Sequence, residues 1–251
     1  YTNSLEISPY GIAANNDNNL WVTDYYNNIL TLIDGNSFNV IKQITFPGTG
    51  NFTDLAYNKE ENIIYIHRLN ENTKGGVIVV IDTNGNLIEE IISPAVSYPT
   101  GLTYHKNLLY VSDRDEPRNI YVLDIQNNYK LIKTYKNPKD ILYGPRGMTF
   151  YNNLIHQNST DFTSGSLTNS EIIIFNSETG NFEKSISFLD VNRFNIRGID
   201  YDIRDGNYWI SDIYGNIYKI ANLVTSYEEP EISKDLLFYP QPAYDFLNLI
   251  L

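Results

Sequence analysis

The chain of 251 residues contains no cysteine, which excludes disulfide scaffolds, thiolate metal sites and cysteine nucleophiles. Cationic side chains are also few: 18 Lys and Arg stand against 30 Asp and Glu, and the formal net charge is −12. Nucleic acid phosphates require clustered Lys and Arg, and no basic stripe is visible here. Apolar runs all fall short of the roughly 18 residues of a membrane span. We therefore expect neither nucleic acid binding nor a membrane span.

The residues that are abundant favour strands and turns. Tyrosine occurs 21 times, and the hydrophobic fraction of 42% is sufficient for a packed core. Helical periodicity of useful length is not visible, whereas short β-branched and aromatic segments alternate with turn formers such as Asp34-Gly35 and Asn84-Gly85. The composition and the pattern together predict an all-β protein.

An apolar segment that ends in a small hydroxyl residue and aspartate recurs along the chain. Three clear copies and two weaker ones are Leu20–Asp24, Leu109–Asp113 and Tyr208–Asp212, then Ile64–Arg68 and Leu154–Asn158. In chain order the copies end at residues 24, 68, 113, 158 and 212, which are 44, 45, 45 and 54 positions apart. Each copy follows a short segment that usually contains glycine and precedes further strand-like segments. The repeat therefore predicts four-stranded antiparallel sheets, which bury both faces by stacking as the blades of a β-propeller.

Five repeats are visible, and the fifth has three clear strands. The extra strand Ser4–Ser8 precedes the first repeat, so we expect it to complete the last blade and close a five-bladed ring over residues 1–226. A six-bladed ring is the alternative. The pattern resembles the NHL-repeat and related YVTN-like propeller families, on Gly11, Gly101 and Gly198 with the segments that end at Asp24, Asp113 and Asp212. That resemblance implies the fold and leaves the function open.

The repeated aspartates and aromatics have a structural interpretation. A carboxylate at the end of a strand accepts N–H bonds from the following turn, so Asp24, Asp113 and Asp212 are expected to fix turns. Trp21, Tyr65, Tyr110 and Trp209 are expected in the core between blades, and the alternative for them is a ligand-stacking surface.

The carboxy-terminal part of the chain differs from the repeats. Residues 227–235 are acidic and contain proline, which suits a linker. Residues 236–251 resemble the opening of the carboxy-terminal sorting domain of the type IX secretion system of the Bacteroidota, on Tyr239, Pro240, Pro242, Asp245, Phe246 and Leu247. The resemblance implies a truncated sorting domain, a secretion shuttle or translocon as partner, and a secreted or outer cell-surface location. An extra edge strand packed on the propeller is the alternative.

Candidate chemistry is sparse. His67, His105 and His156 are not paired at short spacing, and no Gly-x-Ser-x-Gly element occurs. The paired histidines of streptogramin lyases and the glycine-glutamate elements of plant-type glutaminyl cyclases are not evident either. We expect no catalytic residues and no resident metal, although a hydrolase or lyase site at the ring centre is the alternative.

Two loops are candidates for binding. The Ser/Thr/Asn-rich loop between residues 157 and 170 carries Phe162, which could contact a sugar or a protein. The loop after Asp113 adds Asp115 and Glu116 in an acidic cluster. A weaker alternative is calcium at residues 200–206, where three carboxylates precede a glycine. The sequence thus favours a binding or scaffold module with a protein or glycan ligand over an enzyme.

Overall fold

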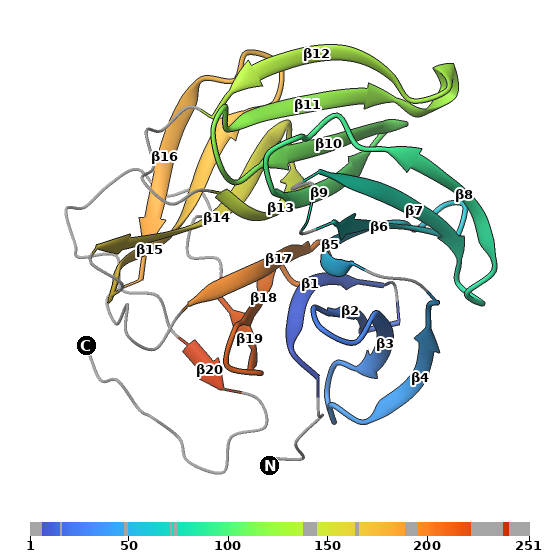
Figure 1. Ribbon diagram of the computed structural model, residues 1–251. Helices are drawn as coiled ribbons and strands as arrows, with labels where there is room; N and C mark the ends of the chain where they lie inside the picture. Colours follow the sequence, from blue (N-terminus) through green and yellow to red (C-terminus); the bar gives the residue numbers. More distant parts are fainter. Residues whose placement is uncertain are drawn as a thin grey trace.

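The computed structural model describes residues 7–15, 17–47, 50–70, 72, 75–137, 145–163, 166–188, 195–221 and 238–240. They form five four-stranded antiparallel sheets arranged as the blades of a β-propeller (Figure 1). The strands are β1 (Pro9–Ala14), β2 (Asn19–Asp24), β3 (Ile29–Asp34), β4 (Val40–Thr45), β5 (Asn51–Asn58), β6 (Ile63–Leu69), β7 (Gly76–Asp82), β8 (Leu87–Ile92), β9 (Pro99–His105), β10 (Leu108–Asp113), β11 (Asn119–Asp124), β12 (Lys130–Lys136), β13 (Pro145–Tyr151), β14 (Leu154–Thr163), β15 (Ser166–Asn176), β16 (Phe182–Ser187), β17 (Ile196–Asp202), β18 (Asn207–Asp212), β19 (Ile217–Ile220) and β20 (Phe238–Pro240). The predicted five-bladed propeller is therefore confirmed.

The core lies between neighbouring sheets. Five hydrophobic clusters fill the five junctions between consecutive blades, including the junction of the fifth blade with the first. The innermost strands are covered on both faces, and all six residues of β1 are buried. The outer strands β4, β8, β12 and β16 are mostly exposed. Burial therefore decreases from the inner to the outer strands. Four aromatic residues expected in the core between blades are all buried, namely Trp21, Tyr65, Tyr110 and Trp209.

Two of the three aspartates that end the second strands fix the turn that follows, as predicted. Asp24 Oδ1 accepts the N–H groups of Tyr26 and Asn27 at 2.9 and 3.1 Å. Asp212 Oδ1 accepts the N–H groups of Tyr214 and Asn216, both at 2.9 Å. In the third blade the prediction was wrong, because Asp113 accepts the N–H of Ser97 in the loop that precedes β9. These carboxylates replace water for turn N–H groups that the sheets leave unpaired.

The amino-terminal strand was wrongly predicted to complete the fifth blade. β20 takes the outer position beside β19, with Tyr218 opposite Pro240 and Ile220 opposite Phe238. Residues 4–6 of the predicted closing strand Ser4–Ser8 lie outside the described residues. Ser8 belongs to the first blade, because its carbonyl accepts the N–H of Tyr25 and its own N–H donates to Asp24. Backbone groups that are already paired with the first blade are not free to complete the fifth.

β20 contains Tyr239 and Pro240, two residues of the predicted sorting motif. Its pairing with β19 is the arrangement that an edge strand on the propeller would show. Pro242, Asp245, Phe246 and Leu247 lie outside the described residues, so the sorting assignment and the domain division remain predictions. Over the described part of the chain, none of the structure is a helix with the length and apolarity that crossing a membrane requires.

Candidate functional site

Two cavities open at opposite ends of the ring axis. The wide cavity, of about 480 Å³, is lined by residues at the ends of the inner strands and in the turns that lead to the second strands. The narrow cavity, of about 170 Å³, is lined where the inner strands begin and where loops follow the second strands. All five inner strands run in the same direction along the axis, so one end of the ring collects their first residues and the other end their last.

Arginine and tyrosine side chains dominate the narrow cavity. Arg114, Arg146 and Arg197 come from three successive blades, and Tyr10, Tyr25 and Tyr98 lie beside them. We call these six residues the arginine mouth. Among the described residues that line this cavity there is no histidine, lysine or carboxylate. The local charge is thus opposite in sign to the net charge of the chain.

Arg146 and Arg197 are the deepest residues of the arginine mouth. Each side chain is only 5% exposed, and each directly precedes the glycine position of its inner strand. Arg197 Nη1 donates to the carbonyl of Ile196 at 3.0 Å, and Arg146 Nε donates to Thr160 Oγ1 at 3.3 Å. Arg146 Nη1 is buried and has no hydrogen-bond partner among the described residues. Burial, reinforced by the like charge of Arg197, lowers the pKa of Arg146 to about 9.

The tyrosines form a connected wall beside the arginines. The Tyr10 and Tyr25 rings stack with centroids 4.8 Å apart, and the hydroxyls of Tyr25 and Tyr98 are 2.8 Å apart. The Arg114 guanidinium lies 3.4 Å from the centroid of the Tyr98 ring. Tyr98 has φ +68°, a left-handed conformation that is strained for a bulky residue. Such strain persists only where the surroundings hold it, and it is concentrated at functional sites.

Between the two cavities, the carboxylate of Asp54 forms hydrogen bonds to other blades near the ring axis. Asp54 occupies in the second blade the position that glycine holds in the other four. Its Oδ2 accepts the N–H groups of Leu102 and Met148 at 2.8 and 3.2 Å. Asp200 is committed in a similar way, to the N–H of Ala14 and the hydroxyl of Thr149. The pKa of each carboxyl is raised, chiefly by burial, so both act here as internal acceptors.

Stacked aromatic pairs surround the wide cavity. His105 stacks on Phe150 and Tyr151 stacks on Tyr201, each pair with centroids 3.8 Å apart. The other two histidines are buried: His67 bonds to Ser93, and His156, in the fourth blade, bonds to Tyr208 in the fifth. Burial lowers the pKa of His67 to about 3 and that of His156 to about 4, so both are neutral at pH 7. His67 and His156 thus serve as hydrogen-bonding residues inside the fold, whereas His105 lies in the lining of the wide cavity.

Three of the four predicted binding residues, Asp113, Asp115 and Glu116, have described side chains. Asp113 is fully buried, where it accepts the N–H of Ser97 at 2.9 Å and the hydroxyl of Tyr121 at 2.8 Å. Asp115 forms an ion pair with Arg114 at 2.8 Å, and Glu116 forms one with Arg118 at 3.1 Å. The side chain of Phe162 lies outside the described part of the structure. A binding role for these four residues therefore stays a prediction.

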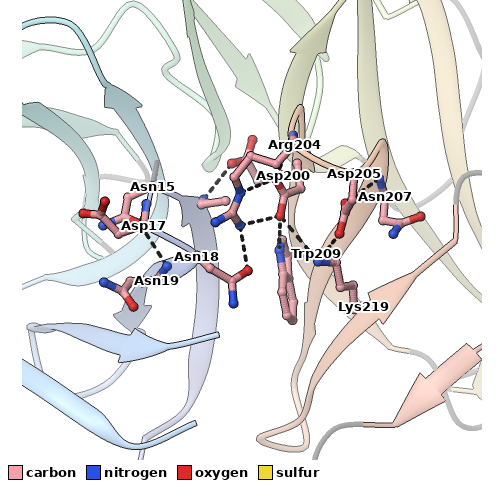
Figure 2. Close-up of polar contacts among 12 residues, drawn as sticks. Asn15, Asp17, Asn18, Asn19, Asp200, Arg204, Asp205, Asn207, Trp209 and Lys219 are labelled. Atoms are coloured by element: carbon pink, nitrogen blue, oxygen red, sulfur yellow. Dashed lines mark hydrogen bonds and ion pairs between the residues drawn. The ribbon is translucent and has the colours of Figure 1, made fainter. Parts of the chain in front are cut away.

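Internal cations hold two of the three carboxylates of the candidate calcium segment, Asp202 and Asp205. Arg204 and Lys219 both contact Asp202, and Lys219 also contacts Asp205. Arg204 further donates to Asn18 Oδ1 at 2.9 Å, which links the fifth blade to the first (Figure 2). No group of three potential metal ligands occurs among the described residues. The segment is thus arranged as a salt-bridged junction between blades.

Sequence reasoning missed the arginine mouth, although one signal was present. The residue before the glycine position is Tyr10, Thr53, Thr100, Arg146 and Arg197 in the five repeats. Two arginines at equivalent repeat positions in an acidic chain point to a shared end of the ring. Nothing local connects them to Arg114 or Tyr98, which reach the same cavity from loops.

Comparisons with known structures support the fold. The chain is similar to glutaminyl cyclase from Myxococcus xanthus, with a TM-score of 0.65 and 12% identity over 85% of this chain and 89% of that one. A chain of a nidogen–laminin complex has a TM-score of 0.56 and 15% identity over 84% and 74% of the two chains. Streptogramin B lyase has a TM-score of 0.52 and 21% identity, over 96% of this chain and 72% of that one. No protein-family model and no curated protein matches the sequence. At these identities the similarity shows a β-propeller fold and leaves activity open.

Proposed function

We propose that this chain is a secreted or cell-surface binding module that takes its ligand at the arginine mouth. The observation that carries the proposal is the convergence of tyrosines and arginines from separate blades on one cavity. Tyrosine and arginine are enriched among the residues that dominate binding energies, because they combine large contact areas with directed hydrogen bonds. The strained Tyr98 backbone adds a second feature that packing alone does not require.

An enzyme is the alternative function, and the geometry favours it less. General acid–base or nucleophilic catalysis needs a proton acceptor aimed into the cavity. The lining of the arginine mouth offers hydroxyls and guanidinium groups, and its described residues include no histidine or carboxylate. Near the ring centre, Asp54 and Asp200 already accept internal hydrogen bonds. A hydrolase or lyase would therefore have to use the wide cavity, whose lining includes Glu60, His105 and Asp200.

A binding screen with a matched pair of variants tests the proposal. The wild-type chain and the variants Tyr98→Gly and Tyr57→Ala would each be tested for binding to a glycan array and to a panel of small organic ligands. Glycine adopts φ +68° without strain, so Tyr98→Gly removes the ring and is expected to fold. Tyr57→Ala alters the wide cavity instead. We expect Tyr98→Gly to weaken binding more than tenfold and Tyr57→Ala to leave it unchanged; the reverse pattern, or turnover of a bound ligand, would contradict the proposal.

We also propose export by a type IX-like route, on the sequence resemblance of residues 236–251. The full-length gene product would be expressed in a Bacteroidota host with an intact or a deleted type IX translocon. Export is expected only with the intact translocon. Equal amounts of the protein outside both hosts would rule out this route.

A further inference from the structure

We infer that the arginine mouth is an oxyanion site, which takes a carboxylate, phosphate or sulfate group on a small organic ligand. This inference rests on the proposed binding function and names the chemistry of the ligand. Its starting point is charge, because the chain as a whole carries −12 and yet three arginines meet at one cavity. Of these, Arg114 is paired with Asp115. Among the described residues, neither Arg146 nor Arg197 forms an ion pair.

Burial makes this unpaired charge expensive. Arg146 and Arg197 are each 5% exposed, and Arg146 Nη1 has no hydrogen-bond partner among the described residues. A buried cation without a partner destabilises a fold, since it loses water and receives no compensating charge. With a pKa of about 9, Arg146 is still protonated at neutral pH. An oxyanion between the two guanidinium groups would supply the missing acceptors and the missing charge together.

The chemistry of the lining selects the class of ligand. A guanidinium group presents paired N–H donors in a planar fork that matches the oxygens of a carboxylate, phosphate or sulfate. The tyrosine wall offers aromatic rings for the organic part next to the anion. The cavity of about 170 Å³ is small compared with drug-sized pockets of about 300–1,000 Å³. It suits an anionic end group with a small attachment.

Thermal unfolding of the full chain at neutral pH tests the inference. Sodium acetate, phosphate and sulfate would be titrated against sodium chloride at matched ionic strength, so the three arms separate carboxylate from phosphate and sulfate. We expect at least one oxyanion to raise the unfolding midpoint along a curve that saturates, as ligand linkage requires. Phosphate and sulfate also stabilise proteins without a site, because they are excluded from surfaces. The decisive readout is therefore the difference between variants.

Three variants give that difference. Arg146→Met and Arg197→Met remove the guanidinium groups and keep much of the apolar volume. Arg68→Met is the control, because Arg68 pairs with Glu90 on the second blade, outside the cavity. We expect the first two variants to weaken oxyanion binding at least tenfold by calorimetry, while the control binds like wild type. In chloride alone, Arg146→Met should unfold at the same midpoint as wild type or higher, because it removes an unpaired buried cation.

Other results would overturn the inference. Equal stabilisation of wild type and Arg146→Met by every oxyanion would show a general salt effect. A large drop in the midpoint of Arg146→Met in chloride, without saturable binding to wild type, would make Arg146 a structural residue. The two proposals fail separately. If the wild type binds only uncharged ligands and Tyr98→Gly no longer binds them, the oxyanion site is refuted and the binding function stands. If oxyanions bind at the arginine mouth but no ligand is found on the glycan array or in the organic panel, the oxyanion site stands and the proposed binding function is refuted.

Discussion

The carboxylate of Asp54, in the second blade, accepts the backbone N–H of Met148, in the fourth blade, at 3.2 Å. The same oxygen accepts the N–H of Leu102, in the third blade, at 2.8 Å. One side chain therefore ties three blades together at the ring axis. It does so from the repeat position where the other blades have Gly11, Gly101, Gly147 and Gly198. The departure from the repeat is thus a structural device.

Replacing Asp54 with the glycine of the other repeats is expected to destabilise the protein. Asp54→Gly leaves two buried N–H groups without their acceptor, and each such loss costs about 1–3 kcal/mol. We expect the free energy of unfolding in urea to fall by about 2–4 kcal/mol. Asp54→Asn keeps an acceptor oxygen and should lose less. Unchanged stability of Asp54→Gly would show that the ring centre does not depend on this carboxyl.

The stability of the protein should depend on pH through Asp54. Burial raises the pKa of Asp54 well above its usual value, although hydrogen bonds from backbone N–H groups oppose the shift. The folded state then holds the proton more tightly than the unfolded state does. This contribution is fully present below the unfolded pKa of about 3.9 and is lost as pH rises through the folded pKa.

Asp54→Asn isolates this titration, because an amide is neutral at every pH. The free energy of unfolding of Asp54→Asn minus that of wild type is expected to increase as pH rises from about 4. Urea unfolding of both proteins across the pH range measures it. Taking the difference cancels titrating groups that do not interact with Asp54. Asp200, whose pKa is also raised, does interact with Asp54 and adds to the difference in the same direction. A difference that stays flat, or that decreases with pH, would contradict the raised pKa.

Glycine at the inner strand is required by the approach of neighbouring blades. A Cβ atom at Gly11 would lie 2.7 Å from both Asp54 Cα and Leu55 N. Because these are backbone atoms, Gly11→Ala must separate the first two blades, and we expect a loss of about 1–3 kcal/mol. Gly206→Ala is the matched control. There φ is +75° and the nearest atom is the Tyr201 hydroxyl at 3.3 Å, so the loss should be mainly the strain of a left-handed alanine, about 1 kcal/mol. Equal unfolding midpoints for the two variants would refute the packing argument.

The pairing of β20 with β19 predicts a role for the carboxy-terminal segment in the propeller. A chain that ends at residue 226 would lack β20 and expose the edge of β19. Open edges pair with other molecules, so we expect a lower unfolding midpoint and more association by light scattering than in the full chain. The full chain under the same conditions is the control. If the shortened chain is equally stable and monodisperse, the propeller does not require β20.

The repeating unit follows from the amino-acid sequence alone. Strand alternation, turn formers and a recurring aspartate are local signals, and each repeat carries its own copy. For that reason the five sheets, the buried Trp21 and Trp209, and the loop-binding roles of Asp24 and Asp212 could be predicted without coordinates. A short-range pattern is enough wherever the partners of a residue lie in the same blade.

Which distant residues meet depends instead on how the ring closes. The fifth blade is completed by Phe238–Pro240, and strand pairing over such a separation leaves no periodic signal. Arg114, Arg146 and Arg197 converge because parallel inner strands bring equivalent ends to one mouth, while a loop from another blade adds the third. The contact from Asp54 to Met148 likewise depends on the radius of the closed ring. These relationships arise from ring closure, which brings together backbones that the sequence keeps far apart.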